Sequence, residues 1–107
     1  MNPDRIILLE KYIQEEPNNP FNTYALAMEY YENDPEKSAE LLIELTINHP
    51  DYLPTYFKAA HLLWEMENHQ KTEELFKQGI QLAKQQGDSK ALQELSSAYQ
   101  NFQFEIE

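Results

Sequence analysis

The sequence predicts an all-α fold of about six helices, and three observations support this prediction. Only two glycines occur among the 107 residues, at positions 79 and 87. Apolar residues recur at intervals of three and four, which is the period of one helix face, and no stretch alternates as a half-buried strand does. Proline follows a helix-capping Asn or Asp at Asn2-Pro3, Asn19-Pro20 and Asp34-Pro35. Proline in this position is typical of the first residue of a helix.

Each expected helix has its own start signal. The three Asn-Pro or Asp-Pro steps begin the first three helices. Pro54 lies in the first turn of the fourth helix, and Asn68 caps the fifth. Gly87 ends the fifth helix and Asp88 caps the sixth. The connections are short, so neighbouring helices are expected to pack antiparallel. The expected helices span residues 3–15, 20–33, 35–48, 53–66, 69–86 and 88–104.

Helix pairs recur along the chain with a period of 33 to 34 residues. An apolar doublet occurs at Leu8-Leu9, Leu41-Leu42 and Leu75-Phe76. The first helices of the pairs repeat as well, since Leu26-Ala27 corresponds to Ala59-Ala60 with a spacing of 33. A repeat of this length predicts a solenoid, in which successive helix pairs stack and bury a continuous core.

The repeat resembles the tetratricopeptide repeat (TPR), whose helix pair carries the pattern W-x2-L-G-x2-Y, then A-x3-F, then proline. Near relatives of these residues occupy most of the matching positions. The first repeat has Thr23, Leu26, Ala27, Tyr30, Ser38, Leu42 and Pro50. The second repeat has Tyr56, Ala59, Ala60, Leu63, Thr72 and Phe76. The last helix offers Leu92, Leu95, Ser96 and Tyr99 in the positions of a first-type helix.

This resemblance implies a right-handed α-solenoid of antiparallel helix pairs in a single domain, residues 1–107. The sequence departs from the family pattern at Thr23, which replaces the large aromatic, and at Lys84, which replaces the proline. Alanine stands at both glycine positions. The parts add up to about the minimum for a stable solenoid. They are an N-terminal half repeat at 3–15, repeat 1 at 20–50, repeat 2 at 53–86, and a C-terminal half repeat or cap at 88–104.

The composition favours a folded domain that acts through protein contacts. Hydrophobic residues make up 41% of the chain and charged residues 25%, which lies in the globular range. Eight Lys and Arg stand against 19 Asp and Glu, a net charge of -11. Nucleic acid and membrane surfaces are therefore not expected partners. The chain has no cysteine, no apolar run of membrane-spanning length and no secretion signal in its first residues, so a cytoplasmic protein is expected.

The sequence contains no recognisable pattern of catalytic or cofactor-binding residues. Two isolated glycines cannot form a phosphate-binding loop, and the four serines lack the glycine flanks of a nucleophile elbow. His61 and Glu65 lie one helical turn apart and would supply half a metal site, but a solvated His and Glu is the simpler explanation. The prediction is a non-enzymatic protein with no catalytic residue, no metal site and no cofactor.

A second stripe of large side chains accompanies the packing stripe on the first helix of each repeat. In the helix at 53–66 it consists of Phe57, His61 and Trp64, with Glu65 beside it. The equivalent residues 33 positions earlier are Tyr24, Met28, Tyr31 and Glu32. In the family that the chain resembles, these positions line a concave groove where a peptide binds. The last helix would add Gln93, Ser97, Gln100 and Asn101 to that groove.

The groove residues predict a protein or peptide partner whose bound segment is apolar and neutral to basic. Large aromatic side chains are typical interface anchors. Tyr31 and Trp64 are expected to form one aromatic platform, because equivalent positions of stacked repeats become neighbours. The TPR domains that clamp the acidic C-terminus of chaperones place Lys, Asn and Arg at groove positions. In this chain those positions hold Tyr24, Met28, His61, Gln93 and Ser97.

Two alternatives to the groove are left open by the sequence. In the first alternative the aromatic stripe is additional core under a neighbouring helix. In the second it is the interface of a small structural homodimer. The C-terminal helix offers a homodimer a different interface, because Phe102, Phe104 and Ile106 lie beyond its expected packing contact.

Overall fold

The computed structural model describes all residues from Met1 to Glu107 and contains six helices and no strand. The all-α class and the number of helices predicted from the sequence are therefore confirmed. Three helices have the predicted bounds, and the others differ by one to three residues at an end. None of the six combines the length and hydrophobicity that a membrane span requires. The helices are α1 (Pro3–Glu15), α2 (Pro20–Tyr30), α3 (Pro35–Asn48), α4 (Pro54–Glu65), α5 (His69–Gln86) and α6 (Ser89–Ile106).

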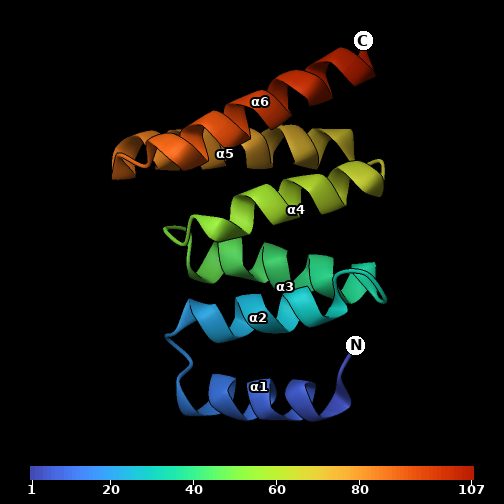
Figure 1. The fold of residues 1–107 in the computed structure, drawn as a ribbon, viewed down its shortest axis with the longest axis vertical. Coiled ribbons are helices and arrows are strands. Elements are labelled where there is room, and N and C mark those ends of the chain that lie inside the picture. The colour runs from blue at the N-terminus through green and yellow to red at the C-terminus, as the bar shows by residue number, and fades with distance from the viewer. The chain divides into compact units, whose positions relative to one another are not determined.

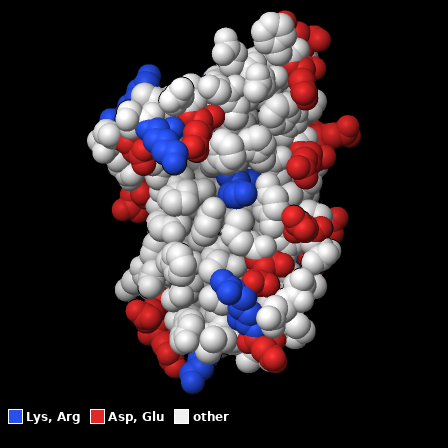
Figure 2. Space-filling model, in the orientation of Figure 1, with Lys and Arg blue, Asp and Glu red and all other residues white.

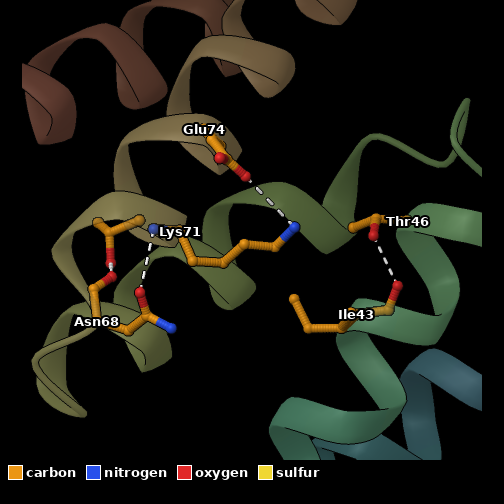
Figure 3. Close-up of polar contacts among 6 residues, drawn as sticks. Ile43, Thr46, Asn68, Lys71 and Glu74 are labelled. Atoms are coloured by element: carbon orange, nitrogen blue, oxygen red, sulfur yellow. Dashed lines mark hydrogen bonds and ion pairs between the residues drawn. The ribbon is translucent and has the colours of Figure 1, made fainter.

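Side-chain caps begin five of the helices, as the sequence predicts. Figure 3 shows the cap of α5, where Oδ1 of Asn68 accepts a hydrogen bond from the backbone N–H of Lys71 at 3.2 Å. A cap of this kind stabilises a helix by about 1 kcal/mol. The remaining caps are Asn2, Asn19, Asp34 and Asp88.

The chain divides into two compact units, residues Met1–Thr55 and Tyr56–Glu107. In the first unit α1 packs on α2 and α2 packs on α3 (Figure 1). The interface between α1 and α2 buries a cluster of apolar side chains, with partly buried residues packed against it. The buried members of this cluster are Leu9, Ala25 and Leu26.

Helix α2 ends three residues before its predicted end, at Tyr30. Asp34 leaves the helical conformation, with φ -141 and ψ 73, because its side chain caps α3. The buried hydroxyl of Ser38 on α3 donates a hydrogen bond to the carbonyl oxygen of Ala27 at 2.8 Å. Ser38 therefore satisfies a backbone acceptor near the end of α2, where intrahelical donors run out.

In the second unit α6 packs on α5, and the fully buried rings of Phe76 and Phe102 lie with their centroids 5.9 Å apart. The hydroxyl of Tyr99 on α6 donates to Oε1 of Glu73 on α5 at 3.0 Å. The prediction that Phe102 lies beyond the packing contact is therefore wrong. The buried stripe of α6 runs Leu95, Ala98, Phe102 at helical spacing, so its contact continues one turn further than expected.

Ser96 also differs from its expected place. The repeat pattern predicts a packing position for Ser96, but its side chain is exposed. Helix α6 packs on α5, and Ser96 is not among its buried residues, which are Leu95, Ala98 and Phe102. The packing position of the repeat is therefore left open to solvent at this helix.

Candidate functional site

Three predicted groove residues of α4 lie in a row along one side of the helix. The rings of Phe57 and His61 have centroids 4.5 Å apart, and those of His61 and Trp64 are 5.8 Å apart. All three side chains are half-buried. We call Phe57, His61 and Trp64 the aromatic row.

Two buried rings fix the orientation of the Trp64 indole. It makes edge contacts with Phe76 at 6.4 Å and with Phe102 at 5.3 Å between centroids. The interplanar angles are 77° and 84°, which is the T-shaped arrangement that aromatic pairs favour. Helices α5 and α6 thus hold a partly exposed indole rigid, as an anchor for a ligand requires.

His61 sits in an apolar setting at the centre of the aromatic row. Its Nε2 atom is fully buried and has no hydrogen-bond partner. Burial lowers the pKa of His61, Lys58 lowers it further, and Glu65 acts in the opposite direction. The neutral imidazole is therefore favoured, and His61 contributes a flat, uncharged ring to this surface.

The predicted groove residues of the first unit are also half-buried, apart from Glu32, which is exposed. The ring of Tyr24 makes an edge contact with Tyr52 at 5.8 Å between centroids. Burial raises the pKa of the Tyr24 phenol, and Tyr52 raises it further. The other two members of this set, Met28 and Tyr31, lie further along the same helix and at its end.

The structure does not join all the predicted residues into one site. Tyr31 belongs to the first unit and Trp64 to the second, so their common platform stays a prediction. The four predicted residues of α6 are exposed, and no hydrogen bond or ion pair links them to the aromatic row. These four residues are Gln93, Ser97, Gln100 and Asn101.

A pocket of about 460 Å³ opens beside the end of the aromatic row in the second unit. It combines the indole of Trp64 with two imidazoles, three carboxylates and one aliphatic side chain. No group of three or more His, Asp or Glu side chains is placed to hold a metal ion. The pocket is lined by His61, Trp64, Glu65, Glu67, His69, Glu105 and Ile106.

Four of these lining residues were not predicted from the sequence: Glu67, His69, Glu105 and Ile106. Glu67 and His69 lie close together, in the turn after α4 and at the first residue of α5, whereas Glu105 and Ile106 come from the last turn of α6, far along the chain. One local signal was available, because the turn after α4 lacks the glycine that usually ends a helix. Glu67 stands there with φ 61, in the left-handed region.

The first unit contains a second cavity of about 460 Å³ beside Thr23. Thr23 occupies the repeat position that Tyr56 holds 33 residues later. The smaller threonine side chain accounts for space that an aromatic ring would fill. The other lining residues are Ile13, Pro17, Asn18, Glu44, Leu45, Asn48 and His49.

Solved structures that are similar to this chain include the following two. A solution NMR structure of a tetratricopeptide repeat domain protein from Salinibacter ruber has 32% sequence identity and a TM-score of 0.75, and the match covers 80% of this chain and 88% of that chain. A crystal structure of a tetratricopeptide repeat domain protein from the same organism has 30% identity and a TM-score of 0.76, with 79% and 97% of the two chains covered. Neither a scan of family models nor a search of curated proteins found a match.

Proposed function

Because the chain belongs to the tetratricopeptide repeat family, we propose that it is a non-enzymatic scaffold or adaptor that binds an apolar, neutral-to-basic peptide segment of a partner protein. The family and the helical-repeat fold predicted from the sequence are confirmed by the two similar structures and the six helices. A fold of this family indicates an interaction scaffold and is typically non-enzymatic. The peptide groove and the character of its ligand are the specific content of the proposal.

The aromatic row is the observation that carries this proposal. Phe57, His61 and Trp64 present ring surface that is only half-buried, and Trp64 is held rigid by two core rings. Rigid aromatic side chains lose little conformational entropy on binding and are enriched among the residues that dominate interface energies. The pocket at the end of the row gives a peptide side chain a place to enter.

Charge supports the basic character of the partner segment. The chain carries a net charge of -11, and the carboxylates of Glu32 and Glu65 are exposed beside predicted groove positions. A field of this sign accelerates the approach of a basic ligand and is screened over about 8 to 10 Å at ordinary salt. Binding should therefore weaken as salt rises, mainly through the association rate, while apolar contacts retain part of the affinity.

The proposed binding residues are given for each unit by itself. Those of the first unit are Tyr24, Met28, Tyr31 and Glu32. Those of the second unit are the aromatic row, Glu65, Gln93, Ser97, Gln100 and Asn101. Replacing both Tyr31 and Trp64 by alanine is expected to abolish capture of the partner.

The chain's single tryptophan allows a direct test. Short labelled peptides that carry a Leu-Phe anchor flanked by arginine, glutamate or serine are titrated while Trp64 emission and label anisotropy are followed. The arginine-flanked peptide should change the emission and bind most tightly, and high salt should weaken its binding. Equal binding of the glutamate-flanked peptide would overturn the proposed charge preference.

A matched pair of aromatic substitutions separates the groove from the rest of the surface. Phe57→Ala removes a ring of the aromatic row, and Phe21→Ala removes a ring that is 59% exposed on α2 and outside the predicted groove. Phe57→Ala should weaken peptide binding while Phe21→Ala leaves it unchanged. Helicity and melting temperature are measured for both variants, and unchanged peptide binding by a folded Phe57→Ala protein would contradict the proposal.

A second candidate function is a small structural homodimer that uses the aromatic row or the end of α6. The favouring observation is that Phe104 and Ile106 remain 76% and 42% exposed on the last turn of α6. Phe102 no longer contributes to this surface because it is fully buried. Light scattering distinguishes the two functions: a stable dimer that Phe104→Ala converts to monomer would favour the homodimer.

A further inference from the structure

Resting on the proposed peptide-binding function, we infer that the pocket beside Trp64 receives the guanidinium group of an arginine side chain. The pocket measures about 460 Å³, which is far larger than an inorganic ion needs and suits the end of a long side chain. Its walls offer an indole, an aliphatic residue and three carboxylates, which together match a flat organic cation carried on an apolar stem.

The carboxylates of the pocket are available to a cationic ligand. Glu65, Glu67 and Glu105 line it and form none of the ion pairs with Lys or Arg in the structure. Figure 2 shows acidic side chains along the edge of the second unit where α4 and α6 end, and no Lys or Arg among them on this face. Burial and then Lys58 lower the pKa of His61, so the neutral imidazole is favoured on this side of the pocket.

The indole of Trp64 distinguishes this pocket from a cluster of acidic residues. A cation over the face of tryptophan is attracted by the ring quadrupole, and guanidinium groups also stack on such rings. Ile106 also lines the pocket and offers apolar contact for the methylene stem of the ligand. A metal ion fits less well, because no three His, Asp or Glu side chains are placed to coordinate one.

Arginine suits the pocket better than lysine. Its planar guanidinium presents five N–H donors in a fixed fork, which can bond to more than one carboxylate while the plane stacks on an indole. Lysine offers a compact and strongly hydrated ammonium group that gains less from a flat aromatic wall. The pocket therefore predicts a preference between two ligands of equal charge.

The backbone conformation of Glu67 gives a second way to test the pocket. Asn68 N–H bonds to the Leu63 carbonyl and Glu67 N–H bonds to the Trp64 carbonyl, which is the Schellman motif that ends a helix. The same two hydrogen bonds end α5, and there the left-handed residue is Gly87 with φ 69. Glu67 adopts a similar φ of 61 without being glycine, so its carboxylate is placed in the pocket at a conformational cost.

The test uses N-acetyl-arginine amide as the probe, titrated into the full chain at low salt and followed by NMR. Matched probes are N-acetyl-lysine amide and N-acetyl-citrulline amide, which is nearly isosteric with arginine but neutral. The arginine probe should shift the indole N–H of Trp64 and the backbone amides of the α4 to α5 turn. Lysine should bind about threefold or more weakly, and citrulline about tenfold or more weakly.

Three variants separate the carboxylate from the backbone at the turn. Glu67→Gln should weaken arginine binding about threefold without changing the melting temperature. Glu67→Gly should weaken binding equally but raise the melting temperature by about 4 to 8 °C, because glycine relieves the left-handed strain. Glu94→Gln, an exposed change on α6 outside the pocket, should alter neither property.

The outcomes for the pocket and for the peptide groove can be told apart. No shift at Trp64 with the arginine probe, or equal binding of citrulline, overturns the pocket even if the labelled peptides still bind to the aromatic row. Equal binding of lysine overturns the guanidinium assignment. Arginine binding without any peptide binding supports the pocket and refutes the proposed function.

Discussion

Replacing Gly79 by alanine tests a close approach between two helices of the second unit. Gly79 lies in the middle of α5 and is buried. A Cβ atom added there would lie 2.8 Å from Cβ of Tyr56 and 3.2 Å from Cδ1 of Leu95. The Tyr56 Cβ is attached directly to the backbone of α4, so a side-chain rotation cannot relieve the contact.

Two opposing effects decide the sign of this change. Alanine is favoured over glycine inside a helix by about 1 kcal/mol. An added methyl group in a packed core costs about 1 to 3 kcal/mol, and a contact with a backbone-fixed atom belongs in the upper part of that range. Gly79→Ala should therefore lower the free energy of unfolding by about 1 to 2 kcal/mol, which corresponds to a fall of roughly 5 to 10 °C in melting temperature.

A neighbouring exposed residue provides the control for helix propensity. Gln78→Gly and Gln78→Ala are compared by urea denaturation with the wild type and Gly79→Ala, since Gln78 is exposed on the same helix. The alanine variant at position 78 should be more stable than the glycine variant by about 1 kcal/mol. If Gly79→Ala also gains about 1 kcal/mol, the close packing of α4 on α5 is refuted.

Leu42→Ala should lower the free energy of unfolding by about 2 to 5 kcal/mol because Leu42 is fully buried. Glu40 is exposed on the same helix, so Glu40→Ala should change this free energy by less than about 0.5 kcal/mol. Equal denaturation midpoints of the two variants would contradict the repeat register. Ser38→Ala should lower the free energy of unfolding by about 1 kcal/mol, because it removes the buried hydrogen bond to the Ala27 carbonyl. An unchanged free energy of unfolding in urea would show that this bond does not stabilise the fold. His61 has its pKa lowered from 6.5 by burial in the folded protein, so its contribution to stability is complete above about pH 6.5 and is lost as pH falls from there through the folded pKa. The stability advantage of wild type over His61→Gln should shrink in that window, and a pH-independent difference would refute the assignment.

The start of each helix could be predicted from the sequence because the signals are local. Asn2-Pro3 and Asn19-Pro20 begin helices through a side chain that bonds to the next few backbone N–H groups. Such contacts need no information from distant parts of the chain. The end of α2 was less predictable, because there the Tyr31 N–H bonds to the Met28 carbonyl and the Ala27 carbonyl accepts from Ser38 of the next helix.

Local signals did not predict which face of α6 is buried or which residues line the pocket. Phe102 is buried and Ser96 is exposed because α6 turns a particular face toward α5, and sequence spacing alone leaves that face open. The pocket brings together residues such as Glu67 and Glu105, which are 38 positions apart in the sequence. Such residues are brought together by helix packing. The one local signal was Glu67 itself, which adopts a positive φ where a glycine is common.

The two repeats divide volume differently at equivalent positions, and this difference bears on where a ligand binds. The second unit places the large Tyr56 against Gly79, while the first has the small Thr23 and the larger Leu45 at the corresponding positions. In the second unit the glycine at position 79 allows α4 to approach α5 closely. Trp64 of α4 contacts the core ring of Phe76 on α5. In the first unit a cavity lies beside Thr23 and Leu45 instead. The indole of Trp64 and three carboxylates line one pocket of the unit where the large residue and the glycine meet, so we expect the ligand selectivity of the proposed groove to reside in the second unit.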